Sequence, residues 1–188
     1  MTKRQDARQN PVMVRVWDPL VRIFHWSLVA SIAFAWLSSD SRGELHQWIG
    51  YSAVALIIVR LLWGFTGTSY ARFSQFIRSP RTVLGYLRAI KTGDEPRYIG
   101  HNPAGGYMII ALMLAVGTTG FTGWMMTTNT YYGDDWVQIV HSLSADGMIL
   151  LVIAHVSGVV LASFRHRENL VKSMVTGVKR KAEADDVQ

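Results

Sequence analysis

Four long apolar stretches alternate with polar segments along this chain of 188 residues. They cover approximately residues 20–39, 46–65, 105–126 and 137–164. Each has about the 20 residues that an α-helix needs to cross a hydrocarbon core of about 30 Å. None has the polar face expected of a helix on the surface of a soluble bundle, so four buried helices of a soluble protein are the weaker interpretation. The pattern therefore predicts an all-α membrane protein built as a bundle of four transmembrane helices.

The basic residues predict the orientation of these helices. Of the 19 Lys and Arg residues, 17 lie within residues 1–22, in the long connection 66–104 or after residue 164. The two short connections carry only Arg42 and several acidic residues. Because basic loops are retained in the cytoplasm, we expect both termini and the long connection on the cytoplasmic side of a bacterial inner membrane. The basic segments are interpreted as anchors at the surface of the lipid bilayer, and no nucleic-acid partner is expected.

The remaining segments complete the predicted organisation. Residues 1–19 are expected to form a cytoplasmic segment, 20–166 the four-helix domain and 167–188 a cytoplasmic tail. The last residues, 182–188, are predicted to be disordered. Within the long connection, apolar residues recur at helical spacing over residues 80–90 among basic ones, which predicts a short helix on the membrane surface.

Composition narrows the chemistry that this bundle could carry. The chain has no cysteine, which excludes a covalent C-x-x-C-H haem site, a disulfide and an iron–sulfur cluster held by its own thiolates. Acidic residues are nearly absent from the spans, which disfavours a carboxylate-rich di-iron site. A metal within the membrane would therefore be held mainly by histidine or methionine.

Four of the six histidines lie within the predicted spans, at His25, His46, His141 and His155. An imidazole in hydrocarbon is costly without a partner, and such residues usually mark functional sites. A single histidine in a span is explained equally well by a hydrogen bond to a neighbouring helix. Four histidines at matched depths are not. The other two, His101 and His166, are predicted to be surface groups.

The positions of the four histidines along their spans predict which of them lie at the same depth in the membrane. His141 and His155 are 14 residues apart on one helix, which separates them by about 21 Å along its axis. Because successive spans run in opposite directions, His25 lies level with His155 on the inner side, and His46 level with His141 on the outer side. Two imidazoles per level suit the axial positions of a haem iron, whereas zinc or copper usually takes three or four ligands at one depth. The sequence thus predicts two non-covalent b-type haems.

Three further residues are predicted to contact these haems. Gly50 follows His46 by one helical turn and leaves room for a porphyrin edge. Arg60 lies on the same helix face at the depth of the inner haem, where a haem propionate would pair with its charge; snorkelling to the membrane surface is the alternative. Arg22, one turn before His25, is a weaker candidate for the same role.

Other residues in the spans allow two interpretations each. Gly117, Gly120 and Gly123 form either a small-residue seam for helix packing or a surface against which a flat cofactor lies. Asp146, the one acid inside a span, is either a hydrogen-bonded interfacial group or a proton acceptor in quinol oxidation.

Several motifs of the chain resemble a known family. They are VRVWDPLVRIFHW at 14–26, RLLWG at 60–64, GHNPAG at 100–105 and RHRENLVKSMVTGVKR at 165–180, together with the two histidines of the last span. Over about residues 12–181 the chain resembles the bacterial cytochrome b561 family, in particular the b-type cytochrome subunit of nickel–iron hydrogenases. This resemblance implies a four-helix membrane bundle, two haem b cofactors ligated by the same four histidines, and electron exchange with quinone.

The sequence therefore predicts a membrane di-haem cytochrome that transfers electrons between the quinone pool of a respiratory chain and a redox partner. It would act either as a quinol or quinone oxidoreductase in its own right, or as a carrier docked to a periplasmic cytochrome c, a hydrogenase or another dehydrogenase. A haem-bearing anchor subunit of such a complex is an alternative. A haem-free transporter is a weaker one, because it leaves the level pairing of the histidines unexplained.

Overall fold

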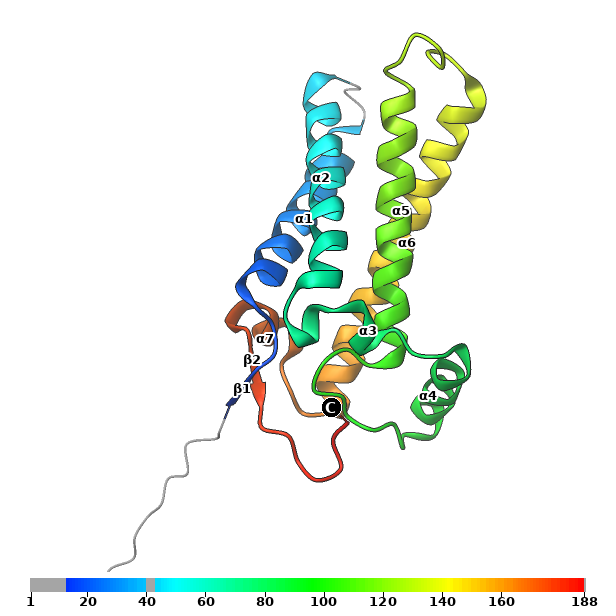
Figure 1. The fold of residues 1–188 in the computed structure, drawn as a ribbon. Helices are drawn as coiled ribbons and strands as arrows, with labels where there is room; N and C mark the ends of the chain where they lie inside the picture. Colours follow the sequence, from blue (N-terminus) through cyan, green and yellow to red (C-terminus); the bar gives the residue numbers. More distant parts are fainter. Residues whose placement is uncertain (1–12, 40–42, 188) are drawn as a thin grey trace, which may run out of the picture.

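The structure is a computed structural model that describes residues 13–39 and 43–187. Its four long helices are α1 (Pro19–Leu37), α2 (Glu44–Thr66), α5 (Pro103–Met125) and α6 (Asp135–Arg165). The shorter elements are the 3-10 turn η2 (Ser69–Ala71), the helices α3 (Phe73–Phe76), α4 (Pro80–Thr92) and α7 (Leu170–Thr176), and the antiparallel strands β1 (Met13–Arg15) and β2 (Val178–Arg180). Figure 1 shows α3, α4, α7 and the two strands gathered where α1 begins and α6 ends, the terminal end of the bundle.

The four long helices confirm the predicted spans. All four are long and apolar enough to cross a membrane. Large apolar side chains cover the outside of the bundle: Leu114 is 66% exposed, Leu150 68% and Leu37 78%. An apolar surface of this extent is unfavourable in water and matches a lipid environment. The chain is therefore a multi-pass membrane protein.

The helices pack in the order α1, α2, α5 and α6, each against the next. A small apolar core fills the middle of the bundle, with Ala53 and Ile57 from α2, Met113 and Val116 from α5, and Met148 from α6. Met148 lies between the two histidines of α6, and the same core continues through Phe73 and Phe76 of α3 to the terminal end.

Side-chain caps fix where the helices begin. Asp18, Ser79 and Asn102 each accept a hydrogen bond from a backbone N–H of the first turn of α1, α4 and α5, and a proline follows each of them. This combination satisfies unpaired N–H groups and presets the first helical φ angle. The second carboxylate oxygen of Asp18 accepts hydrogen bonds from Trp63 Nε1 (3.1 Å) and Thr68 Oγ1 (2.6 Å), which joins the start of α1 to the end of α2. The helix predicted over 80–90 is confirmed as α4.

The C-terminal segment folds back onto the bundle. Strand β2 pairs with β1, and beyond it the Val187 N–H donates to the carbonyl of Arg97 (2.8 Å) while the Ile99 N–H donates to the carbonyl of Val187 (3.0 Å). The prediction of a disordered end is therefore wrong for residues 182–187. Residue 188 lies outside the described residues.

A buried ion-pair network holds this segment in place. Arg97 is 5% exposed and binds Glu168 through two nitrogens, at 2.9 and 3.2 Å, and also binds Asp186. Glu168 additionally accepts from the Arg180 N–H (3.0 Å). Hydropathy alone does not reveal this packing, because the groups that make it are charged.

Replacing Glu168 by Ala should release the C-terminal segment. Removal of one partner from a buried ion pair costs about 3–5 kcal/mol, because the other charge stays buried and unpaired. We expect tryptic cleavage near Lys179 and Arg180 to become faster by a factor between about one hundred and several thousand. Glu183→Ala is the control, since Glu183 is 70% exposed in its pair with Arg180 and exposed pairs contribute little. Equal cleavage of the two variants would show that the network does not hold the segment.

Candidate functional site

The structure brings the four span histidines together as two facing pairs. The ring centroids of His25 on α1 and His155 on α6 are 6.5 Å apart, with 51° between the ring planes. Those of His46 on α2 and His141 on α6 are 6.3 Å apart, at 73°. Helix α6 thus supplies one ring to each pair, and the pairs are those that depth along the helices predicts.

The spacing within each pair fits an iron bound between two imidazoles. A metal–nitrogen bond to imidazole is about 2 Å long and the ring nitrogen lies about 1.1 Å from its centroid, so two trans ligands place their centroids about 6 Å apart. Within the described ranges, no group of three or more His, Cys, Asp or Glu side chains could hold a metal ion. Each level therefore offers two imidazoles, the set that a six-coordinate haem iron takes.

Backbone carbonyls orient the rings of the His46–His141 pair. Nδ1 of His46 lies 3.0 Å from the carbonyl oxygen of Ala35, and Nδ1 of His141 lies 2.9 Å from that of Thr119. A carbonyl oxygen only accepts, so Nδ1 carries the proton in both rings and Nε2 keeps its lone pair for a metal. Hydrogen bonds of this kind are usual for metal-binding histidines and raise their basicity.

Arg60 of α2 is buried against the segment that follows this helix. Its side chain is 3% exposed, which excludes snorkelling to the surface in this structure. Nη2 donates to the carbonyl of Ala71 (2.9 Å), and the guanidinium carbon lies 5.2 Å from the centroid of the Phe73 ring. Nη1 is buried and has no hydrogen-bond partner. A buried guanidinium with one unpaired N–H fits a carboxylate such as a haem propionate.

Two other buried nitrogens of α1 lack partners. Nδ1 of His25 is buried without a hydrogen bond, in contrast to the corresponding atoms of His46 and His141. Nε of Arg22 is unpaired as well, while its Nη2 donates to the carbonyl of Val175. Arg22 thus joins α1 to α7, and its contact with a propionate stays a prediction.

Glycines shape the space around the His46–His141 pair. A Cβ added to Gly50 would meet no atom within 4 Å, which is compatible with a porphyrin edge on that face of α2. A Cβ at Gly123 would lie 3.1 Å from Cε1 of His141, so this glycine lets the ring approach α5 closely. A Cβ at Gly120 would lie 2.2 Å from Cγ2 of Val54, so Gly120 serves the packing of α5 against α2. At Gly120 and Gly123 the structure thus shows the packing role of the glycine series, and a flat cofactor against this series stays a prediction.

The remaining polar residues lie away from the two pairs or at the terminal end. The prediction that His101 is a surface group is wrong: the residue is half-buried, its Nδ1 is buried, and its ring centroid lies 4.6 Å from that of Trp17 and 4.8 Å from that of Phe76. Its position directly before Asn102, the N-cap of α5, is the sequence feature that could have indicated this packing. His166 is half-buried at the end of α6, and Asp146 is exposed on the outside of that helix.

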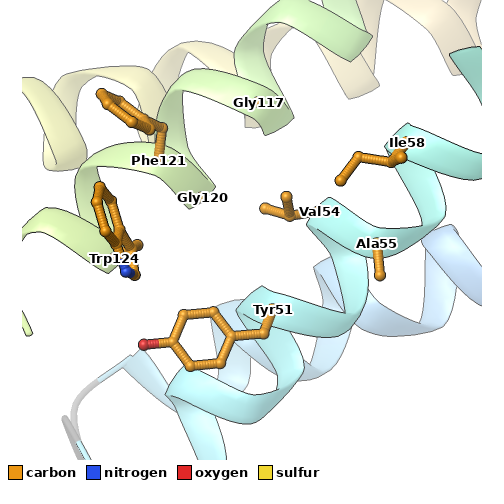
Figure 2. Close-up of a pocket in the computed structure, with 8 residues that line it drawn as sticks. All are labelled: Tyr51, Val54, Ala55, Ile58, Gly117, Gly120, Phe121 and Trp124. Atoms are coloured by element: carbon orange, nitrogen blue, oxygen red, sulfur yellow. The ribbon is translucent and has the colours of Figure 1, made fainter.

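An apolar groove of about 340 Å³ lies between α2 and α5. Figure 2 shows its lining, with the Tyr51 ring reaching from α2 toward Trp124 on α5 and with Gly117 and Gly120 along the α5 backbone. The Tyr51 hydroxyl lies 3.3 Å from Thr127 Oγ1, which links the two helices at one end of the groove. Phe121 and Trp124 are 58% and 49% exposed, so the groove is open to the surroundings of the bundle.

Four apolar spans enclosing two pairs of facing histidines define a membrane cytochrome of b type. The family model of prokaryotic cytochrome b561 matches residues 16–177, and the chain belongs to this family. It is accordingly a b-type cytochrome of the membrane, which binds haem b and takes part in electron transfer. Comparisons with curated proteins and with solved structures gave no significant match.

Proposed function

We propose that the chain binds two haem b groups, one between His25 and His155 and one between His46 and His141, and transfers electrons between the quinone pool and a redox partner. The near-equal ring spacing of the two pairs, 6.5 and 6.3 Å, carries this proposal. When bound, each haem supplies a one-electron iron couple.

The side chains of the bundle would set the properties of these couples. The four imidazoles would hold the two haem irons, and the hydrogen bonds of His46 and His141 to carbonyl groups would strengthen their donation to the metal. Arg60 provides a positive charge at the other level. An apolar core with Met113, Val116 and Met148 lies between the levels, which are separated by roughly 21 Å along α6.

The charge distribution supports a location in a bacterial inner membrane with both termini in the cytoplasm. In this arrangement residues 1–19 and 167–188 face the cytoplasm on either side of the 20–166 domain, and the His46–His141 pair lies near the periplasm. The connections at that end, 38–43 and 126–134, are short. A periplasmic cytochrome c or a hydrogenase or dehydrogenase subunit could therefore approach this level closely.

The groove between α2 and α5 supports access of a quinone to the same level. It is apolar and aromatic, as the ring and isoprenoid chain of a quinone require, and it is open to lipid. Gly120 in its wall lies one turn from Gly123, against which the ring of His141 packs.

The purified protein should contain two haems per chain and exchange electrons with quinol. Both haems should be extracted by acid acetone, because no cysteine is available to bind them covalently. A pyridine haemochrome assay gives the count, and reduction of the oxidised protein by a ubiquinol or menaquinol analogue gives the activity. A count of one would contradict the di-haem proposal, and two haems that no quinol reduces would contradict quinone as the substrate.

A substitution in the groove tests quinone binding separately from haem binding. At Gly117 a Cβ would meet no atom within 4 Å, so Gly117→Leu should fill the groove without straining the helices. We expect a KM for quinol that is several times higher at an unchanged haem count. An unchanged KM would place the quinone elsewhere.

A further inference from the structure

Buried polar atoms without hydrogen-bond partners gather at the terminal end of the bundle. Among the described residues they are Arg22 Nε, His25 Nδ1, Arg60 Nη1, Gln75 Oε1, His101 Nδ1 and Arg180 Nε. Leaving such an atom unpaired costs about 1–3 kcal/mol, so each of them calls for an explanation. Five of the six are nitrogens, which matches a ligand that accepts hydrogen bonds.

The proposed function does not use three members of this group, Gln75, His101 and Arg180, and of these only His101 has a ring nitrogen. It precedes Asn102, whose side chain caps α5, and Pro103, which is fully buried, so the backbone beside His101 is fixed. Its ring lies against Trp17 and Phe76, which are 6% and 0% exposed. The ring is therefore held in one place by rigid neighbours.

The surroundings of His101 are positively charged. Burial, followed by the charges of Arg60 and Lys179 and by His155 and His25, lowers the pKa of His101 to about 3. The imidazole is consequently neutral at physiological pH, with one N–H to donate. Its electrostatic neighbours include both members of the His25–His155 pair and the buried Arg60. Beside the charges of Arg60 and Lys179, the kind of group that fits is an anion.

We infer that His101 donates a hydrogen bond through Nδ1 to a propionate of the haem held by His25 and His155, beside the guanidinium of Arg60. This inference rests on the proposed function. A carboxylate accepts from both donors at once, and it would satisfy the two buried nitrogens together. His101 is then a positioning residue for this haem, fixed by the aromatic rings of Trp17 and Phe76.

The test uses a chain that carries a single haem. In a His46→Ala background, which should hold only the haem of the His25–His155 pair, His101 is replaced by Phe, by Leu or by Gln. Phe keeps the ring packing and removes the N–H, Leu removes both, and Gln keeps a donor. Transfer of haem to excess apomyoglobin in detergent and the propionate bending band in the resonance Raman spectrum are measured. His166→Phe is the matched control, because His166 is half-buried but lies at the end of α6.

His101→Phe and His101→Leu should release the haem about tenfold faster, which corresponds to about 1.4 kcal/mol, and should move the propionate band. His101→Gln should restore both properties toward the background, and His166→Phe should change neither. If His101→Phe and His101→Leu released haem at the background rate and left the propionate band unmoved, the inference would be overturned and the proposed function would stand. The same holds if these variants changed only the KM for quinol. A background without any haem at His25 and His155 would overturn both.

Discussion

Replacing either His25 or His155 by Ala should remove one and the same haem and halve the haem content of the chain. Replacing His46 or His141 should remove the other haem. The physical reason is the pairing of the rings at 6.5 and 6.3 Å, because a haem held between two facing imidazoles would lose half of its protein ligands when one of them is removed. Pyridine haemochrome counts and low-temperature difference spectra of the four variants provide the measurement.

The pairing is tested by comparing the difference spectra of the haem that remains in each of the four variants. The two members of a pair should leave identical residual spectra, and members of different pairs should leave different ones. His166→Ala is a suitable control, because this residue lies outside the spans and should retain both haems. If His25→Ala and His46→Ala removed the same component, the rings would be paired differently from their arrangement in the structure.

Arg60→Gln should lower the midpoint potential of the haem between His25 and His155, by an amount on the order of 60 mV, a tenfold change in a one-electron equilibrium. A positive charge near the iron disfavours the oxidised state, which is the more positive one, so its removal favours oxidation. Arg60 is 3% exposed, and water therefore screens its charge poorly. In the wild-type protein the same haem should have the higher potential of the two, because the hydrogen-bonded imidazoles of His46 and His141 stabilise the oxidised iron at the other level.

A redox titration that follows both haems separately measures this shift. Arg72→Gln is the matched control, since Arg72 lies at the same end of the bundle but is exposed, and its loss should change the potential little. Arg22→Gln tests the other arginine predicted to contact a propionate. An unchanged potential in Arg60→Gln, with a shift in Arg22→Gln, would assign the propionate partner to Arg22.

The sequence determined the spans and the ring pairs because both depend on the position of residues along a helix. Hydrocarbon requires about 20 consecutive apolar residues, so the spans are visible as composition. The pairing of His25 with His155 follows from the rise per residue and from the alternating direction of the spans, without knowledge of which helices are neighbours. The same argument predicts that Arg60 lies at the level of this pair.

Only the tertiary structure decided what depends on contacts between distant segments. The packing of the His101 ring against Trp17 and Phe76 requires contact between the connection before α5 and the segment before α1, and no sequence periodicity predicts that contact. The ordered residues 182–187 depend on Arg97 and its buried carboxylate partners, whose charges in isolation predict exposure. The hydrogen-bond partners of His46 and His141 are backbone carbonyl groups. Every residue has a backbone carbonyl, so the sequence does not indicate which of them accepts from a histidine. The distance between two residues along a helix follows from the sequence alone. Which segments become neighbours depends on how the helices pack.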